Sequence, residues 1–354
     1  MANAFERTAY ALGQTARIGL YWGQKWLTAR MSAPIRSSRP ITGPMPKPAD
    51  ILRDLGDLMR KDWENIAAGY YRLPHDLVTA PIDAVRQAAV YFADFRSVDE
   101  RRQRRDHQQV WREGSTHRYP RYYLQNFHYQ TDGYLSRESA TLYDHQVEVL
   151  FGGGGDAMRR QALVPLYNFL RGRRIADTAL IDIGCGTGRF LTFVKDNYPR
   201  LKTAALDLSP YYLEQATARL RQWRDVRFVQ APAERTGLPD ASFDVATCMY
   251  LFHELPGKVR RQAAAEIARI LKPGGILLLV DSIQLGDRPE YDGLIESFSA
   301  ALHEPYYDDY ARCDLASLFV DAGLHPDAIQ IAYFSRIMTA RKPAAKTRRR
   351  GTRH

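Results

Sequence analysis

A short glycine-rich segment, Asp182-Ile183-Gly184-Cys185-Gly186-Thr187-Gly188, is the part of the chain best suited to hold a small ligand. It follows an apolar run that predicts a buried strand, and an amphipathic helix is expected to begin at Arg189. Glycine permits positive φ and lets a ligand come close to the backbone. In an open α/β sheet such a loop lies at the carboxyl end of a strand, where ligands bind.

The residues around this loop restrict the ligand. A dinucleotide fingerprint needs a third glycine at position 189, which is Arg, and the phosphate-loop pattern is absent. Asp182 disfavours a pyrophosphate and suits an ammonium group. Asp207 ends the next expected strand, 21 residues after Gly186, where a carboxylate can accept hydrogen bonds from ribose hydroxyls. A ligand with a ribose, a cationic end and no phosphate is S-adenosylmethionine (SAM).

Four segments of this region resemble the class I SAM-dependent methyltransferases, and they look closest to the small-molecule branch with the quinone and sterol methyltransferases. They are IDIGCGTGRF, ALDLSPYYLEQA, QAPAERTGLPDASFDVATCMYLFHEL and EIARILKPGGILLLVD, and the resemblance covers about 178–342. At 232–234 the chain has Pro-Ala-Glu, where the family usually has Asp followed by an apolar residue. The resemblance implies a SAM site made of Asp182, Gly184, Gly186, Gly188, Asp207, Leu208, Ala233, Glu234 and Met249.

Methyl transfer is an in-line displacement, so the enzyme must above all align the acceptor with the methyl group. A base helps where the accepting atom carries a proton. His253 and Glu254 follow the expected strand at 243–251 and are predicted as catalytic residues; alternatively, His253 caps the next helix and Glu254 faces water. Acceptor contacts are predicted at Tyr129, Tyr250, His303 and Tyr306, with His128, Asp132 and Tyr307 as further candidates. No metal site is expected, because the three cysteines are too few and too scattered.

The region after residue 178 alternates short apolar strands with amphipathic helices. Such alternation predicts a mostly parallel α/β sheet of the Rossmann-like methyltransferase type, with an antiparallel last strand. Strands are expected at 179–184, 203–209, 226–231, 243–251 and 276–282, and two more near the end of the domain. Helices are expected at 189–197, 211–223, 258–271 and 309–322, with a turn at 272–275.

The preceding region reads as a mainly helical extension over 49–155, with breaks at Leu73-Pro74 and Ala80-Pro81. Six of the 21 tyrosines fall in 119–143. Tyrosine offers an apolar face and one hydroxyl, so this stretch predicts either a cover over a small acceptor or a packing surface between domains. Gly152–Gly155 are expected to form a flexible joint, and Asp156 to cap the next helix.

Both ends of the chain are basic and the body between them is slightly acidic. Residues 1–48 hold seven Lys or Arg and one acid, and 341–354 hold seven Lys or Arg and no acid. Residues 4–30 predict a helix whose apolar row includes Phe5, Leu12 and Trp26, with Arg7, Arg17, Lys25 and Arg30 as its charges. It is typical of a helix on an anionic membrane, of a transit peptide, or of a helix docked on the protein itself.

These features define the expected organisation: a basic segment at 1–32, a Pro-rich linker at 33–48, the extension at 49–155, a methyltransferase domain at 156–342 and a basic tail at 343–354. The expected function is SAM-dependent methylation of a small aromatic or lipid-like acceptor. Two alternatives stay open: methylation of a protein or nucleic acid, and SAM binding without transfer. No nucleic-acid partner, secretory signal or membrane span is expected, which predicts a cytoplasmic protein, at most peripheral to the inner membrane.

Overall fold

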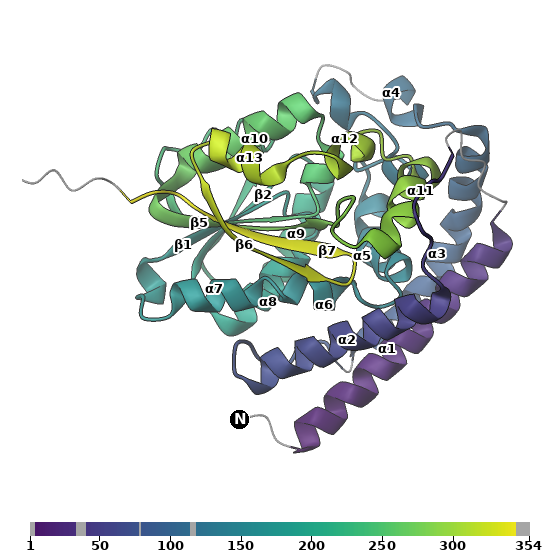
Figure 1. Ribbon diagram of the computed structural model, residues 1–354, viewed down its shortest axis with the longest axis horizontal. Coiled ribbons are helices and arrows are strands. Elements are labelled where there is room, and N and C mark those ends of the chain that lie inside the picture. Colours follow the sequence, from purple (N-terminus) through teal and green to yellow (C-terminus); the bar gives the residue numbers. More distant parts are fainter. Residues whose placement is uncertain (1–3, 33–39, 78, 114–117, 345–354) are drawn as a thin grey trace, which may run out of the picture.

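Seven strands form one twisted sheet at the centre of the described chain (Figure 1). The computed structural model describes residues 4–32, 40–77, 79–113 and 118–344. The strand order is β3-β2-β1-β4-β5-β7-β6; the first five in this order pair in parallel, and β7 is antiparallel to both β5 and β6. The strands are β1 (Ala179–Ile183), β2 (Lys202–Asp207), β3 (Val226–Gln230), β4 (Phe243–Met249), β5 (Leu271–Ser282), β6 (His325–Ala332) and β7 (Ser335–Arg341). The predicted fold class, including its antiparallel last strand, is confirmed.

Helices cover both faces of this sheet, because successive strand residues point to opposite sides. Leu180 and Val245 belong to one apolar core, whereas their neighbours Ile181 and Ala246 belong to the other. In Figure 1, α10 and α13 lie on one side of the sheet and α6, α7 and α8 on the other. The covering helices are α6 (Gly155–Arg160), α7 (Leu163–Leu170), α8 (Arg189–Asn197), α9 (Pro210–Leu220), α10 (Gly257–Ile270), α11 (Asp292–Leu302), α12 (Tyr307–Ala311) and α13 (Leu315–Asp321).

The extension before the sheet is helical, as expected. One break separates α2 from α3, at the predicted Leu73-Pro74; the predicted break at Ala80-Pro81 is wrong, because Pro81 lies in the first turn of α3, where proline is tolerated. The tyrosine-rich stretch contains two 3₁₀ turns rather than long helix. Its elements are α1 (Ala4–Met31), α2 (Pro48–Ala67), α3 (Thr79–Arg104), α4 (Gln109–Glu113), η1 (Arg121–Tyr123), η2 (Phe127–Tyr129) and α5 (Arg137–Leu150).

Helix α1 docks on the protein body through a row that the sequence did not single out. Its buried residues are Tyr10, Gln14, Arg17, Tyr21 and Gln24, whose spacing of three and four gives one helical face. Most of the predicted apolar row is instead exposed on the other side. Two of the expected surface charges also face inward: Arg17 is only 6% exposed, and Lys25 is partly buried.

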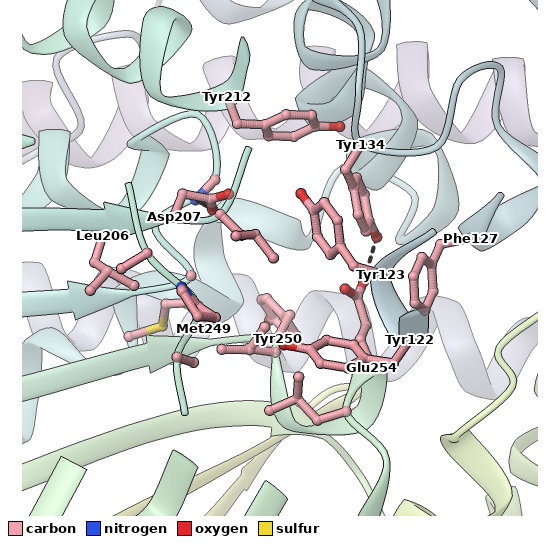
Figure 2. Close-up of a pocket in the computed structure, with 18 of the residues that line it drawn as sticks. Tyr122, Tyr123, Phe127, Tyr134, Leu206, Asp207, Tyr212, Met249, Tyr250 and Glu254 are labelled. Carbon is pink, nitrogen blue, oxygen red and sulfur yellow. Dashed lines mark hydrogen bonds between the residues drawn. The ribbon is translucent and has the colours of Figure 1, made fainter. Parts of the chain in front are cut away.

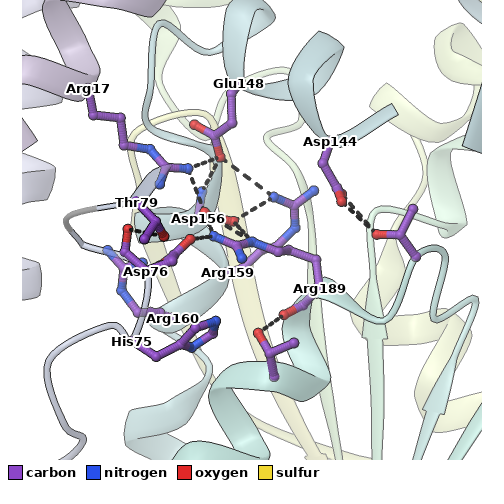
Figure 3. A network of polar contacts seen from close by, with 12 residues as sticks. Arg17, His75, Asp76, Thr79, Asp144, Glu148, Asp156, Arg159, Arg160 and Arg189 are labelled. Carbon is purple, nitrogen blue, oxygen red and sulfur yellow. Dashed lines mark hydrogen bonds and ion pairs between the residues drawn. The ribbon is translucent and has the colours of Figure 1, made fainter. Parts of the chain in front are cut away.

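The four glycines at 152–155 are packed rather than flexible, so that prediction is wrong. A Cβ on Gly152 would lie 2.7 Å from the Trp22 ring of α1, and one on Gly155 would lie 2.7 Å from the Glu148 carboxylate. Asp156 does not cap α6, whose N-cap is Gly154. Its carboxylate instead accepts from Arg17 of α1 and Arg189 of α8 in a buried ionic network (Figure 3). The network ties α1 to the helix that follows the glycine loop.

Two further segments differ from expectation near the end of the sheet. The turn expected at 272–275 is an irregularity inside β5. Leu271 pairs with Phe243 and the next pair is Ile276 with Val245, so β5 has extra residues between the two pairs. The helix expected at 309–322 is two helices, α12 and α13, with α13 capped by the Asp314 side chain. An aspartate that accepts from a following amide favours a new helix start over continuation. The tail from 345 and residues 33–39 of the Pro-rich linker lie outside the described residues.

Candidate active site

A first cavity, of about 720 Å³, lies at the carboxyl ends of β1, β2 and β4 (Figure 2). Its floor includes Gly184 and Gly186 of the glycine loop, which have φ values of 68° and 54°. A Cβ on Gly186 would have Tyr212 at 4.0 Å as its nearest neighbour, so this position has room toward the cavity. Gly188, also at positive φ, packs instead against Ala216 behind the loop.

Asp207 is held rigidly at the edge of this cavity. Its Oδ2 accepts the Gly186 N–H at 2.8 Å, and its Oδ1 accepts the Ser209 N–H at 2.9 Å. Burial raises the pKa of Asp207 to about 6, although these backbone hydrogen bonds favour the charged form. The side chain therefore sits as a preoriented acceptor beside the glycine loop. Leu208, Ala233 and Met249, which were predicted to contact SAM, also line the cavity.

The other residues expected at the SAM site lie just outside the cavity lining. Asp182 is buried beneath the loop, where its Oδ1 accepts from the Thr247 hydroxyl at 2.6 Å. Its Oδ2 has no hydrogen-bond partner within the described residues, and burial raises the pKa of Asp182 to about 7. Glu234 accepts a hydrogen bond from the Tyr122 hydroxyl at 2.9 Å and so helps to fix the aromatic residues that cover the cavity.

Aromatic side chains from the extension close the first cavity on the side opposite the sheet. Tyr134 stacks on Phe127 with ring centroids 5.4 Å apart and meets the Tyr212 ring edge-on at 5.5 Å. The Ser209 hydroxyl, at the end of β2, donates to the Tyr134 carbonyl at 2.6 Å and anchors this layer to the sheet. The aromatic residues of the extension that line the cavity are Tyr122, Tyr123, Phe127, Tyr134 and Tyr143.

Comparison with known proteins identifies this arrangement. Residues 181–279, which include the glycine loop, Asp207 and Met249, match the family model described as a methyltransferase domain. The chain carries a class I SAM-dependent methyltransferase domain. The fold, the loop and the order of the four segments agree with that assignment.

The relatives of this methyltransferase domain include enzymes named for quinone methylation. A demethylmenaquinone methyltransferase of Deinococcus radiodurans is 33% identical over 103 residues, or 29% of this chain and 42% of that protein. A ubiquinone/menaquinone biosynthesis C-methyltransferase of Methylobacterium nodulans is 29% identical over 166 residues, or 46% of this chain and 63% of that protein. This chain thus spans less than two thirds of the length of these curated relatives.

Among solved structures, the YcgJ protein of Bacillus subtilis superimposes with a TM-score of 0.41 at 19% sequence identity. The match covers 52% of this chain and 100% of that one.

SAM is the cofactor of the domain, and the first cavity fits it. The preoriented Asp207 carboxylate offers acceptors for ribose hydroxyls, and the cavity side of Gly186 leaves room for close approach to the backbone. The aromatic cover supplies apolar surface for the adenine end.

A second cavity, of about 860 Å³, adjoins the first on the side of β5. The two cavities share three lining residues, Tyr143, Tyr250 and Glu254, which therefore mark their junction. Tyr250 has φ 55° and bonds the Ser335 side chain through its hydroxyl at 2.7 Å. The remaining lining is mostly apolar and comes from α5, α11 and the loop between β6 and β7, including Val147, Leu150, Phe151, Leu294, Ile295, Phe298 and Phe334.

His253 and Glu254, the predicted catalytic pair, both line the second cavity, in the 3₁₀ turn η4 (Phe252–Glu254). His253 Nδ1 lies 2.5 Å from Asp281 Oδ1. Burial alone would lower the pKa of His253, but the Asp281 carboxylate outweighs it and raises that pKa to about 9. The Tyr134 hydroxyl donates to Glu254 Oε1 at 2.5 Å, and burial raises the pKa of Glu254 to about 7. Neither side chain caps the next helix or faces open water.

The predicted acceptor contacts divide into two groups. Tyr250 and Tyr307 line the second cavity, together with His128. Tyr129, His303 and Tyr306 line neither cavity. They pack beside the cover instead: Gln125 bonds both His303 Nε2, at 3.0 Å, and the Tyr306 hydroxyl, at 2.8 Å, and the Tyr129 ring lies 5.5 Å from His303. Asp132 lies on the same side and accepts from Gln109 at 3.1 Å.

Several residues of this site escaped sequence reasoning. Lys25 of α1 lines the second cavity, donates to the Leu150 carbonyl at 2.8 Å, and has its pKa lowered to about 8 by burial. Asp281 was expected only near the end of a strand, although a carboxylate directly after the apolar run 276–280 was a usable signal. The contributions of α1 and α11 carry no motif, because only the tertiary fold brings these segments to one cavity.

Proposed function

We propose that the protein transfers the SAM methyl group to a small, elongated and mostly apolar acceptor that occupies the second cavity. The observation that carries this proposal is the junction of the two cavities at Tyr143, Tyr250 and Glu254. A donor in the first cavity and an acceptor in the second would meet at these three shared residues. Holding two reactants in line at such a junction is the main source of catalysis for methyl transfer.

The elongated shape of the acceptor is supported by a third cavity, of about 1510 Å³, between α1, α3 and α5. It shares Lys25, His128, Tyr143, Val147 and Leu150 with the second cavity, so the two cavities adjoin. Its walls add Tyr91, Phe95 and Val98 of α3, and the same helix also contributes the charged residues Asp94, Asp99 and Arg102. An acceptor whose reactive head lies at the junction and whose apolar tail lies between these helices would match the mostly apolar lining of both cavities.

In this proposal each part of the chain has a separate task. The glycine loop and Asp207 bind the ribose and methionine ends of SAM. The tyrosine layer excludes water from the junction, as closing elements do in other enzymes. SAM supplies an already activated methyl group. His253, which is protonated beside Asp281, serves to orient the acceptor, and Glu254 serves to receive the acceptor's proton where it carries one.

A cavity-filling variant tests the acceptor site without touching the SAM site. Leu294 lines the second cavity and not the first, so Leu294→Trp places an indole in the proposed acceptor site alone. Transfer of labelled methyl from SAM into the solvent-extractable fraction of a cell lysate should fall at least tenfold, while the calorimetric Kd for SAM stays within about threefold. The matched control is Val320→Trp, on the exposed face of α13. Full transfer activity in Leu294→Trp would place the acceptor elsewhere.

We further propose that the outer face of α1 rests on an anionic membrane. Phe5, Leu12 and Trp26 are 80%, 67% and 54% exposed, and Arg7 and Arg30 lie exposed beside this row. Apolar residues flanked by arginines are suited to the bilayer interface. The third cavity is lined by Thr28, Ala29 and Ser32 near the same end of α1, which gives an apolar acceptor a route from the lipid. Within the described ranges, no helix combines the length and apolar character needed to span a bilayer.

Vesicle sedimentation tests this attachment. Wild-type protein should pellet with vesicles that contain 30% phosphatidylglycerol, and less so as salt is raised, because salt screens exposed charges. The double variant Leu12→Ser, Trp26→Ser should remain largely in the supernatant, whereas the control Val320→Ser should pellet like wild type. Equal pelleting of all three proteins would show that α1 does not carry the contact.

A further inference from the structure

Three ligating side chains converge beside the junction of the two cavities: His128, Glu254 and Glu304. Their nearest ligand atoms all lie within 4.8 Å of one another. They come from three separate places in the chain, namely η2 in the aromatic cover, η4 after β4, and the segment that follows α11. No sequence motif links them, and the fold alone brings them together.

The cluster holds more negative charge than its own residues neutralise. Glu304 is 2% exposed; its Oε1 pairs with His128 Nε2, and its Oε2 has no hydrogen-bond partner within the described part of the chain. Glu254 adds a second carboxylate at the same place. His253 balances the two carboxylates only in part: its Nε2 lies 4.0 Å from Glu254 Oε1, while its Nδ1 pairs with a third carboxylate, Asp281, at 2.5 Å. Buried carboxylates with unmet acceptors are costly unless a cation or proton joins them.

The surroundings also hold these side chains in the manner of metal ligands. The Tyr134 hydroxyl fixes Glu254 at 2.5 Å, and such outer hydrogen bonds orient ligating carboxylates in metal sites. The His128 backbone is held at φ 55°, a conformation that non-glycine residues rarely adopt. Both His128 and Glu254 line the second cavity, which gives an ion from solvent a way in.

We propose that His128, Glu254 and Glu304 bind one divalent metal ion at the acceptor end of the site. One imidazole and two carboxylates suit Zn²⁺ or Mn²⁺, and two negative charges balance a divalent cation. The binding itself is independent of the function proposed above. Its role there, to hold an oxygen of the acceptor by Lewis-acid contact, rests on that function. This site differs from the expectation of no metal site, which considered only the three cysteines, because none of its proposed ligands is a cysteine and they lie far apart in the sequence.

Metal stoichiometry tests the proposal without an activity assay. Untagged full-length protein is stripped with EDTA, incubated separately with Zn²⁺ and Mn²⁺, desalted, and analysed by mass spectrometry for bound metal. We expect about one equivalent of one of these ions in wild type, and at least a tenfold lower content or affinity in Glu304→Gln and in His128→Gln. The control His75→Gln removes a His–carboxylate contact, with Asp196, that has no third ligand, and it should bind metal like wild type.

Two measurements keep the result interpretable. Thermal unfolding and the Kd for SAM show whether each variant is folded and whether the first cavity is intact. Less than one tenth of an equivalent of either ion in wild type would overturn the proposal, and so would equal metal content in wild type and in folded Glu304→Gln. If wild-type protein did not bind SAM, the proposed function would be contradicted, but the measured metal content would still decide whether the metal site exists.

Discussion

The Asp207 carboxylate accepts the Gly186 N–H at 2.8 Å, which joins the end of β2 to the middle of the glycine loop. One hydrogen bond thus fixes the two elements that we assign to the ribose and methionine parts of SAM. Both elements are also covered by the tyrosine layer from the extension.

Adding a side chain at Gly186 should weaken SAM binding. Gly186→Val puts two methyl groups where the ligand approaches the backbone, at a φ of 54° that also strains valine. We expect at least a tenfold increase in the calorimetric Kd. Gly172→Val is the matched control, because Gly172 also has positive φ and open space but lies at the end of α7, away from the cavity. A similar increase of the SAM Kd in both variants would show that backbone strain, and not a lost contact at Gly186, causes the effect.

SAM affinity should depend on the ionisation of Asp207. Because burial raises the pKa of Asp207 to about 6, the carboxylate is charged at pH 7 and mostly protonated at pH 5. The protonated form loses acceptors for ribose hydroxyls, so the Kd should rise about tenfold between pH 7 and pH 5. Asp207→Asn should bind weakly and without this step. A wild-type Kd that is constant over this range would contradict the assigned role.

The docking of α1 should depend on Arg17. Its guanidinium lies 2.5 Å from Asp156 and 2.9 Å from Glu148, and all three side chains are buried (Figure 3). Arg17→Met leaves two buried carboxylates with less compensation, which should cost about 3–5 kcal/mol of unfolding free energy. Urea denaturation measures this loss. Arg53→Met, which breaks an exposed pair with Asp50, should change stability little, and an equally small effect of Arg17→Met would mean that the network does not hold α1.

Much of the sheet could be predicted because each strand and helix carries its own pattern. The helix at 189–197 was predicted with its observed bounds, since Gly188 precedes it and Pro199 follows soon after. The region 309–322 was harder, because the apolar spacing continues across Asp314 and only the side-chain cap at that residue divides the helices.

The helical extension was harder still to predict from the sequence, because the side chains that it turns toward the protein body are largely polar and aromatic. Arg17 and Lys25 look like surface charges in a sequence, yet one is neutralised by carboxylates far along the chain and the other lines a cavity. The same limit applies to His128 and Glu304, whose proximity depends on how the cover folds over β4 and β5. The tyrosines were recognisable as a group, but their position over the first cavity required the tertiary structure.

The most direct test of the account is the fate of a labelled methyl group. Wild-type protein is incubated with tritiated SAM and a lysate of a strain that lacks the gene, and radioactivity is counted separately in the organic extract, the precipitated protein and the nucleic acid. We predict that the label enters the organic extract and falls at least tenfold with Asp207→Ala. Label confined to protein or nucleic acid, or none above a heat-inactivated control, would contradict methyl transfer to an apolar small molecule.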